Sequence, residues 1–160
     1  MVRGAAAKKV GWRKHTLLYK LNVPYYPSGN NERVIHYSEV LLMMAECQNE
    51  TNDPEATVLG TLNQVRDRKD VSMPHYPTVN YPTATKDQRF RAIVHEKRVE
   101  LAGEEIRNRD ILRWRAQGKI PTIVPEPISF FAAKYALLPI PQNEVDRNPN
   151  IGQANQNPGY

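Results

Sequence analysis

The sequence predicts a mainly α-helical protein, built from antiparallel helix pairs with long proline-rich irregular loops between them and an extended tail behind them. Apolar residues recur at helical spacing in four stretches between residues 35 and 115. Turn-forming residues separate these stretches, and seven of the 13 prolines lie in residues 120–160, where no period is visible. Helices therefore account for the middle of the chain, and irregular structure accounts for its ends.

Length and charge divide the chain into two parts. A chain of 160 residues is typical of one domain with one core. Residues 1–33 hold seven Lys or Arg and one acid, a balance of +6, so the other residues sum to −1 against the total of +5. We predict a basic, irregular segment over 1–33, with a candidate strand or buried extended run at 16–21, and a helical domain over 34–160.

The basic segment has two interpretations. Clustered positive charge can hold a nucleic acid or an anionic lipid surface. Aromatic residues that could stack on bases do not alternate with these charges, apart from Trp12. A solvated, irregular segment is therefore the interpretation that the sequence favours.

Several classes of protein are excluded by composition. No apolar run approaches the ~18 residues that a membrane-spanning helix needs. Cys47 is the only cysteine, so an internal disulfide is excluded. Residues 1–20 have neither the apolar stretch nor the lipid-accepting cysteine of a lipoprotein signal. If the parent protein is exported, we expect its signal and its anchor to lie outside this chain.

The first predicted helix covers residues 35–50. Apolar side chains occupy most of its circumference, namely Tyr37, Val40, Leu41, Leu42, Met43, Met44 and Ala45. A helix that is apolar on most sides is usually buried on most sides. We therefore expect this helix to lie inside the core and its Cys47 to be an inert, buried thiol.

The second predicted helix begins three or four residues later, and so short a connection makes the two helices an antiparallel pair. Asp53 is suited to cap its start, Pro54 to occupy its first position, and Glu55 to complement the positive end of its dipole. An apolar stripe then extends towards Arg68 and consists of Val58, Leu59, Leu62 and Val65.

The third predicted helix begins at Thr85, because Thr85 and Gln88 have the spacing of a capping box. Before it, residues 70–84 have no period and carry three prolines, which predicts a long loop. The buried face of the helix is expected to consist of Phe90, Ile93, Val94 and Leu101.

A fourth helix is expected over residues 105–115, after a break at Gly103. Ile111 and Trp114 are expected to face inward. The following residues, 120–160, are expected to form an extended tail with one hydrophobic run at 135–140.

Charged residues are dense on the third and fourth helices. We predict a structural ion-pair network there, because acids and bases three or four residues apart are neighbours on a helix. Its members are Glu100, Glu104, Arg107, Asp110 and Arg113. A basic partner holds a carboxylate in its ionised form, whereas an acid catalyst must hold a proton. Glu96 has no base at that spacing, so it would need a partner from another element.

Neither catalysis nor a cofactor is indicated. The histidines are scattered, and none forms the paired spacing of a metal site on one helix face; they are His15, His36, His75 and His95. The sequence also has no Gly-rich phosphate loop and no nucleophile motif. We expect no catalytic residue, no metal and no cofactor, and hence a protein that is not an enzyme.

Aromatic residues of the loops are the candidate ligand-binding side chains. Tyr76 and Tyr81 in the 70–84 loop offer flat faces on which sugar rings can stack, as do Tyr25 and Tyr26. The same rings can instead pack their loops onto the helices. This structural role is the one that the sequence favours.

Four motifs, in the same order, resemble those of the SusD/RagB family. Residues 36–46 (HYSEVLLMMAE) are similar to the family's RYAEVLLxxAE helix, and residues 62–68 (LNQVRDR) to its NxVRxR helix end. Residues 96–114 (EKRVELAGEEIRNRDILRW) resemble its ERRxELxxEGxRxxDxxRW signature. The end of the chain, from LPIP at 138–141 to QNPGY at 156–160, is similar to the family's C-terminal run.

The resemblance covers about residues 33–160. Two positions differ from the family pattern, since Gly103 stands where the family tends to have an aromatic residue and Glu105 where it tends to have glycine.

The resemblance implies a surface lipoprotein of the outer membrane. Members of this family capture glycans or peptides and cover a SusC-like, TonB-dependent transporter. Full members also carry tetratricopeptide-like helix pairs on the N-terminal side, so this chain resembles the C-terminal region alone. The family's aromatic glycan-binding arc has no matching motif here, so the resemblance implies no ligand-contacting residue.

Two functional hypotheses follow. The first is a non-catalytic binding component of an uptake system, with an oligosaccharide or peptide as ligand, a SusC-like transporter as partner and no nucleic acid. The second is a stand-alone helical interaction module that binds a protein or a nucleic acid through its basic N-terminal arm. A gene for a TonB-dependent transporter beside the parent gene would favour the first hypothesis.

Overall fold

The structure is a computed structural model that describes residues 2–3, 10–11, 34–69, 72–124 and 133–160. Within these residues the fold is mainly helical, as predicted. Four of the five α-helices follow one another as α1 (Tyr37–Glu50), α2 (Glu55–Arg66), α3 (Lys86–Glu100) and α4 (Ile106–Ala116). The predicted basic segment 1–33, including the run 16–21, lies outside the described residues except at positions 2–3 and 10–11.

The remaining elements are short. Strands β1 (Val2–Arg3) and β2 (Val10–Gly11) are antiparallel, with Val2 opposite Gly11 and Arg3 opposite Val10. Near the C-terminus lie the 3-10 helices η2 (Ala133–Ala136) and η3 (Gln153–Asn155) and the helix α5 (Gln142–Arg147). None of the helices in the described ranges is both long enough and apolar enough to cross a membrane.

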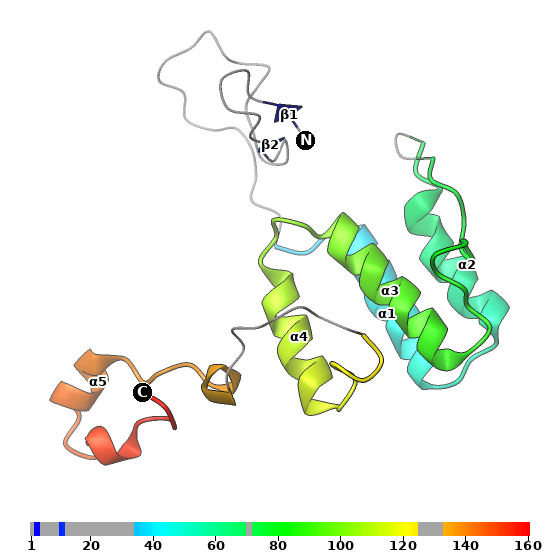
Figure 1. The fold of residues 1–160 in the computed structure, drawn as a ribbon. Helices are drawn as coiled ribbons and strands as arrows, with labels where there is room; N and C mark the ends of the chain where they lie inside the picture. The colour runs from blue at the N-terminus through cyan, green and yellow to red at the C-terminus, as the bar shows by residue number, and fades with distance from the viewer. Residues whose placement is uncertain (1, 4–9, 12–33, 70–71, 125–132) are drawn as a thin grey trace, which may run out of the picture. The chain divides into compact units, whose positions relative to one another are not determined.

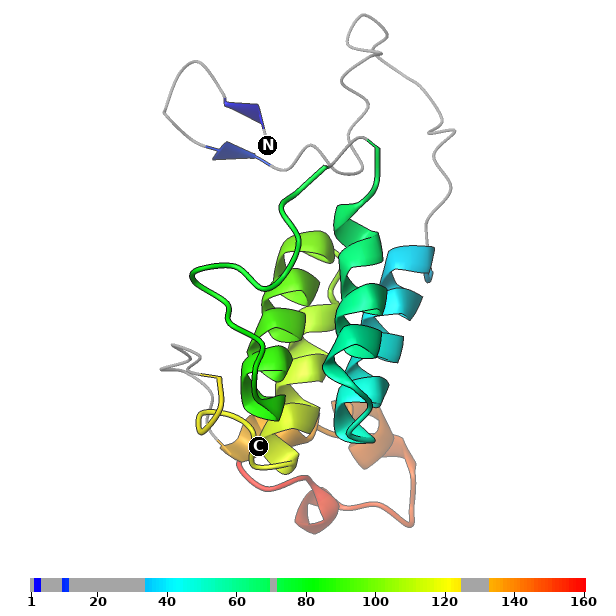
Figure 2. The ribbon, with the colours of Figure 1, turned by 90° about the vertical axis from the view of Figure 1, so that its right-hand side faces the viewer.

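The chain forms two compact units, residues 1–110 and 111–160. In the first unit α1, α2 and α3 lie side by side in both views (Figures 1 and 2). Their core is a cluster of apolar side chains, among them Leu42, Val58, Leu62, Ala92 and Ile93, each 0% exposed. The predicted division at residue 33 stays a prediction.

The connection between α1 and α2 is tight, as expected for an antiparallel pair. The amide of Asp53 donates to the Gln48 carbonyl at 2.9 Å, which reverses the chain within a few residues. The prediction that Asp53 caps α2 is wrong, because Pro54 occupies the N-cap position. The Asp53 carboxylate instead accepts a hydrogen bond of 2.8 Å from the Thr51 hydroxyl, inside the turn.

Helix α1 is buried on one face, which contradicts the prediction that it is buried on most sides. Helices α2 and α3 cover the face that carries Leu41, Leu42 and Ala45. The other apolar side chains are exposed, namely Tyr37 (71%), Val40 (45%), Met43 (40%) and Met44 (51%). Cys47 is exposed as well, so its prediction as a buried thiol is wrong. Apolar spacing alone does not tell how many neighbours a helix has.

The start of α3 has the predicted capping box. The Gln88 amide donates to the Thr85 hydroxyl at 3.2 Å, and the Thr85 amide donates to the Gln88 side chain at 3.1 Å. The predicted inner face is confirmed, since Phe90, Ile93, Val94 and Leu101 are all buried. The loop before the helix is irregular over the described residues 72–84, apart from a bridge between Thr78 and Tyr81.

The corner between α3 and α4 is made by two residues with positive φ. Gly103 has φ 81° and lies in the predicted break, after the end of α3 at Glu100. Glu105 has φ 59°, immediately before the first residue of α4. On α4 the predicted inward residues Ile111 and Trp114 are buried.

The second unit is less regular. The prediction of an extended tail is incomplete, because η2, α5 and η3 interrupt it; three- to six-residue helices are too short to show a period in the sequence. The side chain of Gln156 pairs with the backbone of Ile140, accepting from its amide at 2.7 Å and donating to its carbonyl at 2.9 Å. Asn157 donates to the Leu138 carbonyl at 2.6 Å, so the end of the chain folds back on residues 138–140.

Candidate functional site

The loop of residues 72–84 is held on α2 and α3 by a buried polar cluster. Asn63, on α2, brackets the backbone of Tyr76: its side-chain nitrogen donates to the Tyr76 carbonyl at 3.1 Å, and its oxygen accepts from the Tyr76 amide at 2.9 Å. Because both backbone groups of Tyr76 are satisfied by one side chain, the loop can pass over the helices without a strand partner.

Arg66, Glu96 and Tyr76 form the centre of this cluster. Arg66 Nε donates to Glu96 Oε2 at 2.8 Å, and Arg66 Nη2 donates to the Tyr76 hydroxyl at 3.2 Å. The Tyr76 hydroxyl lies 3.0 Å from Glu96 Oε2, and the Arg66 guanidinium lies 3.9 Å from the centre of the Tyr76 ring. The three residues are at most 5% exposed. Glu96 thus takes its partner from another element, and the sequence alone could not identify that partner.

Two more rings complete the cluster. His95 Nδ1 lies 2.8 Å from the Tyr76 hydroxyl, and the His95 ring lies against Tyr81 with 4.1 Å between ring centres and a tilt of 32°. Tyr81 also meets Tyr76 edge to face, at 6.1 Å. Offset and edge-to-face pairs are the favourable arrangements of aromatic rings. The loop is therefore fixed by ring packing as well as by hydrogen bonds.

Burial controls the protonation of the cluster. It raises the pKa of Tyr76, and the Glu96 carboxylate raises it further, so the hydroxyl keeps its proton. Burial also lowers the pKa of His95; Arg66 and Arg98 add to this effect, and Glu96 opposes it. Both shifts favour the uncharged form, so a neutral imidazole and a protonated phenol share the hydrogen bond between His95 and Tyr76.

The structure places the two predicted ligand residues differently. Tyr76 is 3% exposed, so its ring is packed inside the cluster and offers no open face. Tyr81 is half-buried, with one face against His95. A sugar could reach Tyr76 only if the loop opened. The ligand-binding role of this pair stays a prediction.

Three of the five predicted ion-pair residues have partners on other elements. Asp110 lies 2.9 Å from Lys97, Glu104 lies 2.6 Å from His36, and Glu100 binds Arg68 at 2.6 Å and 3.1 Å. The two other members are Arg107, which is half-buried, and Arg113, whose guanidinium lies 5.1 Å from the Trp114 ring. The stabilising role of this network stays a prediction.

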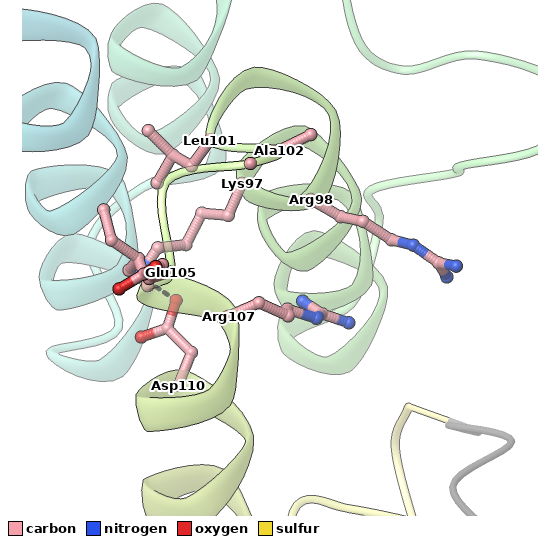
Figure 3. A pocket seen from close by; sticks show the side chains of 9 residues that line it. Lys97, Arg98, Leu101, Ala102, Glu105, Arg107 and Asp110 are labelled. Carbon is pink, nitrogen blue, oxygen red and sulfur yellow. Dashed lines mark ion pairs between the residues drawn. The ribbon is translucent and has the colours of Figure 1, made fainter. Parts of the chain in front are cut away.

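Described residues of the first unit line two cavities. One, of about 330 Å³, lies where α3 ends and α4 begins, and residues from Lys97 to Asp110 line it (Figure 3). The other, of about 410 Å³, lies between the start of α1 and the end of α2 and is lined by residues such as His36, Gln64 and Arg68. In the described part of the chain no group of three or more His, Cys, Asp or Glu side chains is placed to hold a metal ion. The expectation of no metal and no cofactor stays a prediction.

Sequence reasoning missed Asn63, Arg66 and His95. Asn63 and Arg66 are three residues apart on α2, beside the apolar stripe, and both are buried. Two polar residues within the inner face of a helix are the signal that could have identified them, since buried polar groups need partners.

Comparison with known proteins identifies the family. A profile of the SusD family matches residues 4–160, so the chain belongs to this family. It is 32% identical to SusD-like protein P25 of Formosa agariphila over 148 residues, which cover 87% of this chain and 27% of that protein. It is 31% identical to SusD-like protein P2 of the same organism over 137 residues, covering 83% of this chain and 26% of that protein. The chain thus spans about a quarter of the length of either relative. No solved structure matches it significantly.

Proposed function

We propose that this chain is the C-terminal portion of a non-catalytic nutrient-binding component of an outer-membrane uptake system. The family match over residues 4–160 carries the proposal. The parent protein would be a lipid-anchored protein on the cell surface. Its ligand would be an oligosaccharide or a peptide, and its partner a SusC-like, TonB-dependent transporter.

The family-like motifs have a structural role in this chain. Glu46 comes from the first motif, Arg66 from the second, and Glu96, Lys97 and Asp110 from the third; together they make the two buried ion-pair groups. These five side chains are committed to internal contacts rather than to a ligand. Specificity for a nutrient would then depend on other residues, such as those of the 72–84 loop.

The same geometry supports a binding role over a catalytic one. The buried carboxylates of Glu46, Glu96 and Asp110 are each within 3.3 Å of a lysine or arginine nitrogen. Carboxylates committed to buried cations are poor proton donors. Sustained hydrolysis of a polysaccharide or peptide by the purified chain, abolished by one carboxylate substitution, would contradict this part of the proposal.

One observation favours the second candidate, a helical interaction module. The exposed face of α1 carries Tyr37, Val40, Met43 and Met44, and exposed apolar patches often mark protein interfaces. The same face fits the first proposal, because a longer parent protein has further surfaces to cover it. High-affinity binding of the isolated chain to DNA or RNA would favour the module.

Co-purification tests the uptake proposal. The full-length parent, expressed with a SusC-like transporter of the same organism, should co-purify with it as a stable complex. This chain alone should not, because a stable interface buries at least about 1,000 Å² and this chain could supply that area only with most of one face. Absence of a complex with the full-length parent would overturn the proposal.

Ligand binding by this chain should be weak. One or two aromatic faces give a sugar little beyond the entropy that it loses, so we expect dissociation constants in the millimolar range, roughly −4 kcal/mol. Tyr81→Ala should weaken that binding, and Tyr135→Ala, in the second unit, is the matched control. Micromolar affinity that survives loss of both Tyr76 and Tyr81 would place the ligand elsewhere.

A further inference from the structure

The cavity at the α3–α4 corner has an apolar wall and a charged rim. Its volume is about 330 Å³, and all of its lining residues belong to the first unit. Leu101, Ala102 and Ile106 form the apolar part. The charged part consists of Lys97, Arg98, Glu105, Arg107 and Asp110. In small-molecule sites an apolar wall holds the body of the ligand, and polar groups fix its orientation.

The charges on its two sides are unequal. On one side Lys97 already neutralises Asp110, at 2.9 Å, and Glu105 lies on this side too (Figure 3). On the other side Arg98, from α3, and Arg107, from α4, extend in the same direction, away from these carboxylates (Figure 3). Two guanidinium groups from different helices thus share one side of the cavity.

The two arginines repel each other. Burial lowers the pKa of Arg107, and the charge of Arg98 lowers it further, whereas Asp110 opposes the shift. Arg98 is exposed, and within the described residues it makes no hydrogen bond or ion pair. An anion placed between the two groups would relieve this repulsion. Ile106, the first residue of α4, also lines the cavity, and the N-terminus of a helix carries a partial positive charge.

We propose that this cavity binds a small anionic group, a carboxylate or a sulfate, between Arg98 and Arg107, with the body of the ligand against Leu101 and Ile106. Guanidinium groups bind planar or tetrahedral oxyanions through paired, charge-assisted hydrogen bonds. A neutral sugar has no charged group that could form such a pair. The inference deepens the proposed function, because it assigns an acidic group to the nutrient. The anion could be the carboxylate of a uronic acid or peptide, or a sulfate ester.

Titration of the purified chain with three probes tests the site. Inorganic sulfate and glucuronate should bind and shift the NMR signals of residues 97–107, whereas glucose should not. If glucuronate binds better than sulfate, the ligand is a carboxylate with a sugar body; the reverse order indicates a sulfate ester. Binding of glucose as strong as that of glucuronate would overturn the proposal.

Matched variants separate a site from general positive charge. Arg98→Ala should weaken anion binding roughly tenfold, which corresponds to about 1.4 kcal/mol. It should not lower the melting temperature, because Arg98 is exposed and its loss removes a repulsion of Arg107. Arg109→Ala removes the same charge from an exposed position of α4 that does not line the cavity, and should bind as the wild type does. Equal affinity of the two variants would overturn the proposal.

A second variant tests the role of Arg107, the half-buried arginine of the proposed site. Arg107→Lys keeps the charge but loses the paired hydrogen bonds, so its anion affinity should fall in a protein that still folds. Unchanged affinity would contradict a role for Arg107. Each of these outcomes is independent of the uptake proposal, because transporter co-purification of the parent does not depend on anion binding at this corner.

Discussion

Lys97 places its ammonium nitrogen 2.9 Å from a carboxylate oxygen of Asp110, although the two residues lie on different helices. The same nitrogen lies 3.3 Å from Glu46 on α1. The three side chains are 3–8% exposed. One buried ammonium group therefore connects α1, α3 and the start of α4.

Removing this ammonium group should cost more stability than removing one of its acids. Lys97→Met removes the ammonium group that lies beside the buried carboxylates of Glu46 and Asp110. Breaking a buried ion pair costs about 3–5 kcal/mol. Asp110→Ala leaves the Lys97–Glu46 contact in place, so it should lower the melting temperature by several degrees, less than Lys97→Met does. Urea unfolding of the two variants measures the order.

Arg68→Ala is the control for a less buried pair. The Arg68 side chain is 42% exposed, and an exposed ion pair contributes about 0–1 kcal/mol. A loss for Lys97→Met no larger than that for Arg68→Ala would show that the buried group contributes no more than a surface pair.

Cys47 should react with a thiol reagent in the folded protein. The residue is exposed on α1, on the face opposite Leu42 and Ala45. We expect its reaction with DTNB to be within about tenfold of the rate in denaturant, because access limits thiol reactivity and this side chain has access.

Moving the thiol across the helix gives the matched control. In Ala45→Cys combined with Cys47→Ser, the single thiol lies at a position that is 0% exposed and should be protected. Circular dichroism checks that the variant is folded. Protection of Cys47 in the wild type would mean that the α1 face is covered in solution.

Local signals were the part of the fold that the sequence could predict. The Thr85–Gln88 capping box and the break at Gly103 depend on residues a few positions apart, and both are present. The contact between Arg66 and Glu96 joins residues 30 positions apart, and nothing in either helix identifies the other as its partner. Nor does apolar spacing reveal which face of α1 meets a neighbour.

The candidate site shows the same limit. The sequence indicated Tyr76 and Tyr81 because flat rings in a proline-rich loop can bind sugars or pack on helices. Its preference for packing agrees with the environment of Tyr76, whose backbone and hydroxyl are bound by residues of α2 and α3. Those residues are distant in the chain, so the choice depended on tertiary contacts.

Glu105→Gly should stabilise the protein. Glu105 has φ 59°, a left-handed conformation that costs a residue with a Cβ atom roughly 1–2 kcal/mol. Glycine avoids this cost but loses more chain entropy on folding, so the net gain should be roughly 0.5–1 kcal/mol. The family pattern has glycine at this position. Urea unfolding measures the gain.

Glu105→Ala separates the backbone effect from the charge. It removes the carboxylate but keeps the Cβ atom, so it should bring no such gain. Equal stabilisation by the two substitutions would show that the charge of Glu105, rather than its backbone conformation, is the unfavourable feature.

The stability of the 72–84 loop should fall in mild acid because of His95. Burial holds the pKa of His95 below its ordinary value of 6.5 in the folded protein; Arg66 and Arg98 act in the same direction, while Glu96 opposes them. When the folded pKa of a group lies below its unfolded pKa, the stability that it contributes is present above the unfolded value and is lost as the pH falls. The free energy of unfolding should therefore decrease between pH 7.5 and pH 5.5.

His95→Asn identifies the source of this decrease. Asparagine can still form a hydrogen bond with the Tyr76 hydroxyl, but it does not titrate, so the variant should lose less stability than the wild type over the same pH range. Loss of the ring contact with Tyr81 lowers its stability at every pH, and the comparison therefore concerns the slope with pH rather than the absolute value. Urea unfolding at several pH values gives both. Equal slopes for the two proteins would show that the pKa of His95 is the same in the folded chain as in the unfolded one.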